Sequence, residues 1–355
     1  MLILVADCPQ NDSYITSLIK AYVEAGHTVI CDHNNFFCSN ITPDIVHIHW
    51  PERLYQWYPL SEKTDEAKIE ILNERMKSYK NNGAIIVFTI HDLVLHYSTE
   101  RQLDEKIFNI VIKHSDIISH HCINSVKLFK SLYPLAESKK NIVNHLNDYS
   151  INYKYISKEK ARSELNIPLE KFVILNFGSQ QPYKGGKFIE TVFNKLPIKS
   201  KFLLIAGNYY YRGFPLWKKY ILEIKNNLRE KKVYRDRKYI YRTVNEDEIA
   251  LIFHASDMVF SGHKAGLNTG LIPFAATYAK PIVYPEIGCF SASAKDWVSI
   301  GYEPGNIKQA SEALMELYNN LVKDKITLDN SIWMQKNSWN THVELILQTV
   351  NKFKN

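Results

Sequence analysis

Residues 172–208 read FVILNFGSQQPYKGGKFIETVFNKLPIKSKFLLIAGN, and this stretch decides the fold. It begins with an apolar run that ends in a glycine turn, continues with an amphipathic segment, and finishes with a second apolar run. Short apolar runs bounded by turns are typical of buried strands, and the segment between them has the spacing of a helix. A strand, a helix and a strand in this order predict a βαβ unit with parallel strands.

The same alternation continues along the chain. Near the start, LILVA (2–6) is strand-like, SYITSLIKAYVEAG (13–26) is helical, and TVICD (28–32) resumes as a strand. We therefore predict an α/β fold of two Rossmann-like doubly wound domains, which face a ligand cleft at the carboxyl ends of their strands.

A polar segment, residues 144–157, interrupts the alternation and separates the two domains. We expect an N-terminal domain over residues 1–150 and a C-terminal domain over residues 151–335. The last segment, residues 336–355, contains the amphipathic run NSWNTHVELILQTVNKF. We expect this run to form a helix that packs back on the N-terminal domain.

Composition excludes several classes of protein. The 355 residues are 45% hydrophobic, enough for two domain cores. No apolar stretch reaches the roughly 18 residues of a membrane-spanning helix. The N-terminus turns polar too early for a signal peptide, so we expect a cytoplasmic protein. The cysteine spacing matches no zinc site and no nucleic-acid-binding motif is recognised, so we expect neither a metal site nor a nucleic-acid partner.

Positive charge is concentrated in one region of the sequence. The whole chain has a formal net charge of +7, and the region from Lys218 to Arg242 holds ten Lys or Arg against three Asp or Glu. Such a region is either a solvated helix face or a surface that meets an anionic partner such as a membrane.

Two loops of the N-terminal domain carry candidate chemistry. In HIHWPERLYQW (47–57), His49 and Glu52 stand among aromatic residues, a composition that suits a sugar ring; the alternative is a half-buried aromatic loop. In TIHDLVLH (89–96), His91 and Asp92 are suited to proton transfer or to orienting a hydroxyl. Adjacent residues do not face each other in an extended strand, so a direct His91–Asp92 pair is not expected, and Asp92 can instead cap a turn.

Two loops of the C-terminal domain predict an anion site. In NFGSQQPYKGGKF (176–188), Gly178 turns the chain, and Lys184 precedes two glycines and a helix. Such a loop offers backbone N–H groups, a positive helix end and a lysine to a phosphate, although glycine here can also serve only to turn the chain.

The second of these loops is SGHKAGLNTG (261–270). His263 and Lys264 add positive charge, its glycines allow close approach, and Asn268 or Thr269 can cap the helix that follows. A capped turn without a ligand is the alternative.

These segments together resemble a known family. FGSQQPYKGGKF is similar to a strand, loop and helix of bacterial glycosyltransferases of the GT-B fold, particularly glycosyltransferase family 4. NEDEIALIFHASDMVFSG and GLNTGLIPFAATYAKPIVYPEIG resemble later segments of that family. VHIHW and TIHDL resemble strand ends of its acceptor half. The resemblance keeps the order of segments over essentially the full chain.

The resemblance implies a hexosyltransferase-type enzyme that needs no metal and no cofactor. It would move a sugar from a nucleotide-diphospho-sugar, held by the C-terminal domain, to a saccharide acceptor, held by the N-terminal domain. Lys184 would meet the diphosphate, the turn 266–270 would cradle it, and His91 would lie near the donor sugar. Surface polysaccharide synthesis (capsule or exopolysaccharide) with a lipid-linked acceptor is the implied pathway, which would place the protein peripherally at the inner membrane face.

Two departures from the family pattern limit which residue roles the resemblance implies for this chain. Family members usually place two glutamates around this loop and helix, where this chain has Phe274–Ala276, and the usual arginine before Y-K-G is Gln180 or Gln181. Glu286 is the nearest acid and would either contact the ribose or cap the PEIG turn.

The stereochemistry of transfer therefore stays open. If the enzyme inverts, a general base must take the acceptor proton, and Glu52, Asp92 and His49 are the candidates. Other functions of the same fold are a non-catalytic partner subunit and a two-domain sugar phosphorylase or epimerase.

Overall fold

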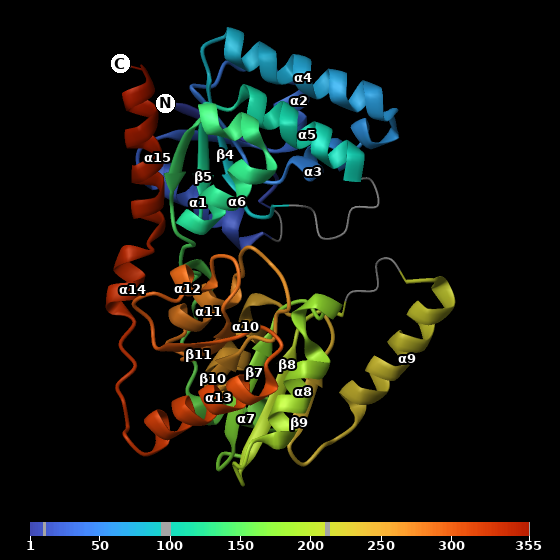
Figure 1. Cartoon of the computed structure of the whole chain (residues 1–355), viewed down its shortest axis with the longest axis vertical. Coiled ribbons are helices and arrows are strands. Elements are labelled where there is room, and N and C mark those ends of the chain that lie inside the picture. The colour runs from blue at the N-terminus through green and yellow to red at the C-terminus, as the bar shows by residue number, and fades with distance from the viewer. Residues whose placement is uncertain (10–11, 94–100, 210–213, 355) are drawn as a thin grey trace. The chain divides into compact units, whose positions relative to one another are not determined.

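The computed structural model describes residues 1–9, 12–93, 101–209 and 214–354. The chain forms two compact units (Figure 1). The first unit comprises Met1–Asn147 together with Lys336–Asn355, and the second comprises Asp148–Gln335.

The first unit is built on a parallel sheet. Its strands are β1 (Leu2–Val5), β2 (Thr28–Cys31), β3 (Ile45–Ile48), β4 (Ile85–Ile90), β5 (Ile117–His120) and β6 (Lys140–Val143). Within the described residues their order is β2-β1-β3-β4-β5-β6, and every neighbouring pair is parallel. Strands β3 and β4 are buried along their whole length, as expected when helices cover both faces of a sheet. The order reverses direction between β1 and β3, so a ligand site is expected beyond the ends of these two strands.

The helices of the first unit follow the strands in alternation. They are α1 (Ser13–Glu24), α2 (His33–Cys38), α3 (Pro51–Gln56), α4 (Asp65–Asn81), α5 (Arg101–His114), α6 (Ile123–Leu132) and α15 (Trp339–Lys354), with the 3-10 turns η1 (Leu60–Glu62) and η2 (Pro134–Ser138). Asp12 caps α1 by accepting hydrogen bonds from the backbone N–H groups of Tyr14 and Ile15, and Gly26 ends the turn after α1 in the left-handed region.

Helix α15 returns from the end of the second unit to pack on α1 (Figure 1). Its apolar face contributes to one core with α1 and the sheet through Trp339, Val343, Ile346 and Val350. The predicted return of the C-terminal helix to the first unit is therefore confirmed.

The second unit also has a parallel sheet. Its strands are β7 (Phe172–Phe177), β8 (Lys201–Ala206), β9 (Arg237–Ile240), β10 (Met258–Phe260), β11 (Ile282–Pro285) and β12 (Ser299–Tyr302). Within the described residues their order is β12-β11-β10-β7-β8-β9. The order reverses between β7 and β10, which marks the expected ligand site of this unit.

Helices cover both faces of the second sheet. They are α7 (Lys158–Glu164), α8 (Gly186–Lys195), α9 (Leu216–Lys231), α10 (Glu246–Ala255), α11 (Leu271–Thr277), α12 (Phe290–Ser293), α13 (Ile307–Val322) and α14 (Ser331–Lys336), with η3 (Ser150–Asn152) and η4 (Pro182–Lys184). Alternate residues of β7 enter opposite cores: Val173 and Leu175 pack with α10 and α11, whereas Ile174 packs with α8 and α13.

The prediction of two doubly wound α/β domains is confirmed in both units. Its detail differs in the first unit, whose strand order is that of a flavodoxin-like sheet, whereas the second unit has the Rossmann order. Among the residues that the structure describes, no helix combines the length and the apolar composition that a membrane crossing requires.

Candidate functional site

The two glycine-containing loops of the second unit lie at its switch point, because one follows β7 and the other follows β10. Their backbones touch. A Cβ on Gly185 would lie 2.0 Å from the carbonyl oxygen of Gly262, and a Cβ on Gly262 would lie 2.6 Å from Ile189 in α8. Gly185 also has a φ of +73°, so both the backbone conformation and the space favour glycine. The backbone N–H of Lys264 donates to the carbonyl of Tyr183 at 2.7 Å, which closes the contact between the loops.

Lys184 points back over the end of β7. Its ammonium nitrogen lies 3.5 Å from the position that a Cβ on Gly178 would take. Gly178 has a φ of +111° and donates its N–H to Ala206 at the end of β8. The loop therefore holds a cation directly above the carboxyl ends of the central strands.

Gln180 and His263 are buried inside these loops. The Gln180 amide donates to the carbonyl of Gly178 at 2.8 Å and to Oδ1 of Asn176 at 3.2 Å. The Nδ1 of His263 lies 2.8 Å from the hydroxyl of Ser261. Both side chains therefore fix the loop backbone from within, whereas Lys264 is exposed.

The start of α11 differs from the expected capped helix end. Gly270 occupies the N-cap position, and the hydroxyl of Thr269 accepts the N–H of Leu271 at 3.2 Å. Asn268 precedes it in the same turn and is half-buried. Phe274, which stands where the family that the sequence resembles carries an acid, stacks on Tyr149 with ring centroids 3.8 Å apart and planes 5° apart. An aromatic pair therefore occupies the region of the missing glutamate.

Glu286 lies outside the Phe274–Tyr149 stack. It is exposed, and its carboxylate packs against Gly301 in β12, since a Cβ on Gly301 would lie 2.6 Å from Oε1 of Glu286. Its backbone N–H donates to the carbonyl of Tyr302 at 2.8 Å.

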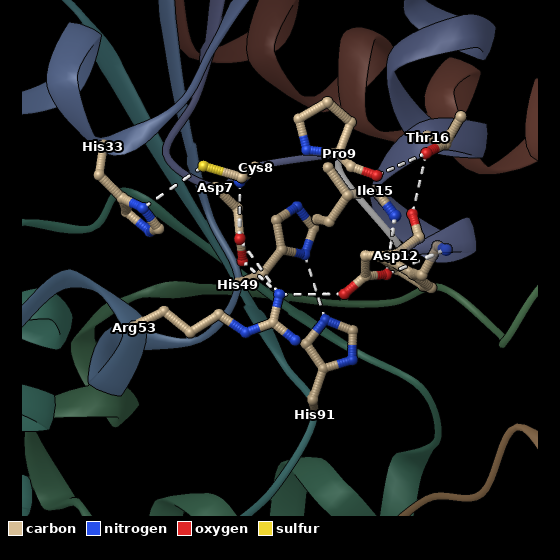
Figure 2. Close-up of polar contacts among 11 residues, drawn as sticks. Asp7, Cys8, Pro9, Asp12, Ile15, Thr16, His33, His49, Arg53 and His91 are labelled. Carbon is tan, nitrogen blue, oxygen red and sulfur yellow. Dashed lines mark hydrogen bonds and ion pairs between the residues drawn. The ribbon is translucent and has the colours of Figure 1, made fainter. Parts of the chain in front are cut away.

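In the first unit an arginine joins two carboxylates at the switch point between β1 and β3. Arg53 in α3 donates to both oxygens of Asp7, at 3.1 and 3.0 Å, and to Asp12 at 3.0 Å (Figure 2). Asp7 is buried and follows β1, and Asp12 is the N-cap of α1. Burial raises the pKa of Asp7, and the charge of Arg53 and the hydrogen bonds to Asp7 partly oppose this effect. Arg53 thus compensates a carboxylate that would otherwise be costly to bury.

A stack of flat groups continues from Arg53 into the site. The guanidinium carbon lies 3.8 Å from the ring centroid of Trp50, and Trp50 stacks on His91 at 4.2 Å with planes 17° apart. His49 and His91 form a hydrogen bond of 3.1 Å between Nδ1 and Nε2 (Figure 2). The structure therefore pairs His91 with His49 across neighbouring strands β3 and β4.

Further histidines are buried around this pair. His47 lies within β3 and bonds Thr89 and Tyr22, His121 follows β5, and His342 comes from α15. Burial lowers the pKa of His121 to about 4. Burial also lowers the pKa values of His49 and His91 well below their usual range, and neighbouring histidines add to this effect. At neutral pH the cluster is uncharged, and the His49–His91 bond joins two neutral rings.

Glu52 has the opposite shift. Burial, and to a smaller extent the nearby charge of Asp92, raise its pKa to about 8. Its Oε2 is buried and makes no hydrogen bond among the described residues. A carboxyl group with a pKa near the working pH is suited to acid–base chemistry.

Sequence reasoning missed several residues of the first unit's site. Asp7 and Asp12 flank a strand end, and an acid directly after a buried strand is a signal that could have identified Asp7. His342 gave no such signal, because its contact depends on the return of α15. Within the described ranges no three His, Cys, Asp or Glu side chains are grouped as metal ligands.

Comparisons with known proteins extend the fold assignment. No family model matches the chain. No curated protein matches it either. Among solved structures, HepE from Anabaena, in complex with UDP-glucose, has a TM-score of 0.70 at 14% identity over 99% of both chains. Sucrose-phosphate synthase from Thermosynechococcus elongatus has a TM-score of 0.71 at 10% identity, over 99% of this chain and 98% of that one. A glycosyltransferase from Rickettsia africae has a TM-score of 0.65 at 14% identity, over 99% and 97%. These likenesses confirm the GT-B fold.

Proposed function

We propose that this chain is a nucleotide-sugar-dependent glycosyltransferase. The observation that supports this most is the backbone contact between the β7 and β10 loops, with Lys184 held above the strand ends. This is where doubly wound sheets bind nucleotides, and a cation beside closely approaching backbone suits a diphosphate. The similar structure of HepE contains UDP-glucose, which adds support for this class of donor.

The donor-site residues divide into two roles in this proposal. Lys184 and Lys264 meet the diphosphate, and their positive charge stabilises it as it leaves, so that no metal ion is required. Gln180 and His263 position the loops, because both side chains bond within them. Gly178, Asn268 and Thr269 shape the turns beside the diphosphate, and Glu286 is the acid assigned to the ribose.

Glu52 is the proposed general base for an inverting transfer. Its raised pKa of about 8 keeps a substantial fraction protonated at neutral pH, and its ionised form can take a proton from an acceptor hydroxyl. Asp92 tunes that pKa by its charge. His49 uses Nδ1 for the bond to His91, so its buried Nε2 is the nitrogen that can orient a hydroxyl group, and His91 is the residue proposed near the donor sugar.

The acceptor in this proposal is a saccharide, and more narrowly a lipid-linked saccharide in bacterial surface polysaccharide synthesis. The protein would then work in the cytoplasm, peripherally at the inner face of the membrane. The family resemblance and the basic sequence from Lys218 to Arg242 are the support for this part.

A thermal-shift screen against UDP- and GDP-sugars tests the donor assignment. A ligand at about 100 times its Kd stabilises the native state by about 2.7 kcal/mol, so the correct donor class raises Tm. Lys184→Ala and Lys264→Ala should weaken that effect. Lys187→Ala is the matched control, because Lys187 is exposed on α8 and lies three residues beyond Lys184.

Turnover is then measured with the donor that binds. Transfer or slow donor hydrolysis by the wild type, lost in Glu52→Gln with donor binding retained, supports the proposal. Binding of no nucleotide sugar would contradict it and favour a non-catalytic partner subunit, for which the Phe274–Tyr149 stack in place of an acid is the specific observation. Phosphate-dependent sugar release would indicate a phosphorylase instead.

A further inference from the structure

Helix α9 presents an apolar stripe to solvent. Leu216, Tyr220, Ile224 and Leu228 recur every four residues, Trp217 and Ile221 lie beside them, and all six side chains are exposed. Trp217 is 67% exposed and Leu228 63%. Figure 1 shows α9 standing off from the sheet of the second unit. An apolar patch of this extent on a protein surface marks an interaction site.

The polar side of α9 faces the second unit. Asn226 is the buried residue of the helix, and Arg229 pairs with Glu190 of α8 at 3.3 Å and lies over the ring of Tyr239. An ordinary surface helix packs its apolar stripe against the core. In α9 that arrangement is reversed, and no described residue of the unit buries the six side chains of the apolar stripe.

Cations flank the exposed stripe. The helix holds five Lys or Arg against two Glu, a net charge of +3. Lys218 and Lys225 lie along one edge of the stripe, and Lys231 and Lys232 lie at its C-terminal end. All four are exposed and make no ion pair with a described residue.

The two acids of α9 are engaged within the second unit. Glu223 lies 3.9 Å from Lys219, and Glu230 lies 3.8 Å from Arg242. The surface around the stripe is therefore cationic, and its electrostatic complement is an anionic surface.

We propose that α9 is an interfacial helix that binds an anionic phospholipid bilayer, with its apolar stripe inserted among the acyl chains. A helix with aromatic and aliphatic residues on one face and lysines beside them lies in the plane of a membrane surface. Trp217 and Tyr220 have the amphipathic rings that collect at the level of the headgroups. A second copy of the chain fits less well, because the same lysines would meet each other across a two-fold axis.

This binding rests on the peripheral membrane association proposed above, and vesicle sedimentation of the full-length protein tests it without an activity assay, so its failure would leave the donor assignment standing. The protein is sedimented with vesicles of phosphatidylcholine alone or with about 30% phosphatidylglycerol, at about 0.1 M and about 0.5 M NaCl. The wild type should bind the anionic vesicles more tightly than the neutral ones. The preference should shrink at high salt and in Lys218→Glu/Lys225→Glu, because the lysines attract the headgroups.

The apolar contribution is tested by Trp217→Ser/Leu228→Ser. This pair should weaken binding to anionic vesicles roughly tenfold or more, since it removes the inserted surface. The matched control is Leu169→Ser/Ile332→Ser, which removes two side chains of the same unit that are 59% and 58% exposed but lie outside α9. The control should bind as the wild type does. Vesicles should also shift the tryptophan emission of the wild type to the blue, and Trp217→Phe should lose that part of the shift.

Three results would overturn the proposal. Wild-type protein that stays in the supernatant with every vesicle would refute it. Equal losses in the α9 pair and the control pair would assign binding elsewhere. Self-association in solution that only the α9 pair abolishes, without vesicle binding, would show that a second copy covers the stripe.

Discussion

Replacement of Arg53 by methionine should destabilise the first unit through Asp7. Asp7 is 2% exposed, and Arg53 donates to both of its carboxylate oxygens and to Asp12. Removing one partner of a buried pair costs about 3–5 kcal/mol. Because Arg53 itself is 37% exposed, water screens the interaction, and we expect a loss of about 2–3 kcal/mol at pH 7.5.

The loss of stability in Arg53→Met should depend on pH in a defined direction. Burial already raises the pKa of Asp7, and removal of Arg53 raises it further, because the charge and the hydrogen bonds that lower it are gone. A carboxyl group with a raised folded-state pKa destabilises the protein increasingly as pH rises above its unfolded value of about 3.9. The loss in Arg53→Met should therefore be smaller at pH 5 than at pH 7.5.

Amide hydrogen exchange, followed by mass spectrometry on peptides from β1 and β3, measures the stability of the first unit alone. Arg75→Met is the matched control, because Arg75 donates to the carbonyls of Phe36 and Ser39, so its loss should not vary with pH. Asp7→Asn combined with Arg53→Met should recover part of the stability. Equal losses at both pH values, or full additivity of the two changes, would refute the reasoning.

Three other predictions concern single contacts. Because the pKa of Glu52 is raised from about 4.3 in the unfolded chain to about 8 in the folded one, the stability of the wild type should decline as pH rises between these values. Glu52→Gln should abolish this decline, which urea unfolding across the pH range measures. A parallel decline in the variant would contradict the prediction. Gly185→Ala should lower both Tm and donor affinity, since its Cβ meets backbone at 2.0 Å, whereas Gly305→Ala, at φ +81° with open space, should cost only about 1 kcal/mol of backbone strain. Equal effects of the two alanines on donor affinity would exclude the loop contact as its cause. Ile346→Ala should lower the stability of the first unit by about 2–4 kcal/mol, which is measured as faster amide hydrogen exchange in β1. Glu344→Ala, at an exposed position of the same helix, should leave that exchange unchanged.

Local patterns were sufficient to predict the elements of the fold. The runs 172–177 and 201–206 form β7 and β8, because a buried parallel strand needs a continuous apolar run, and a sequence shows that directly. Parallel strands joined by helices then restrict the topology to doubly wound sheets. The flavodoxin-like order of the first sheet depends on whether β3 pairs with β1 or with β2, and no residue in the sequence specifies this choice locally.

The sequence predicted which loops carry the candidate site, but not which of its side chains contact each other. Strand-end position drew attention to Glu52, His49 and His91, and the structure places all three at strand ends or in the helix that follows. The bond between His49 and His91 joins residues 42 positions apart in the sequence, and the salt bridge from Arg53 to Asp7 joins residues 46 positions apart. Periodicity carries no information on such long-range side-chain contacts.

The place of α15 in the first unit has a consequence for synthesis. Residues up to Asn147 emerge from the ribosome first, yet their core lacks Trp339, Val343, Ile346 and Val350 until the whole second unit has been made. At about 5–20 residues per second this interval lasts roughly 10–40 s. Strands β1 to β6 are all made by Val143, so the N-terminal half has its complete sheet during this interval but lacks the α15 part of its core until translation nears its end.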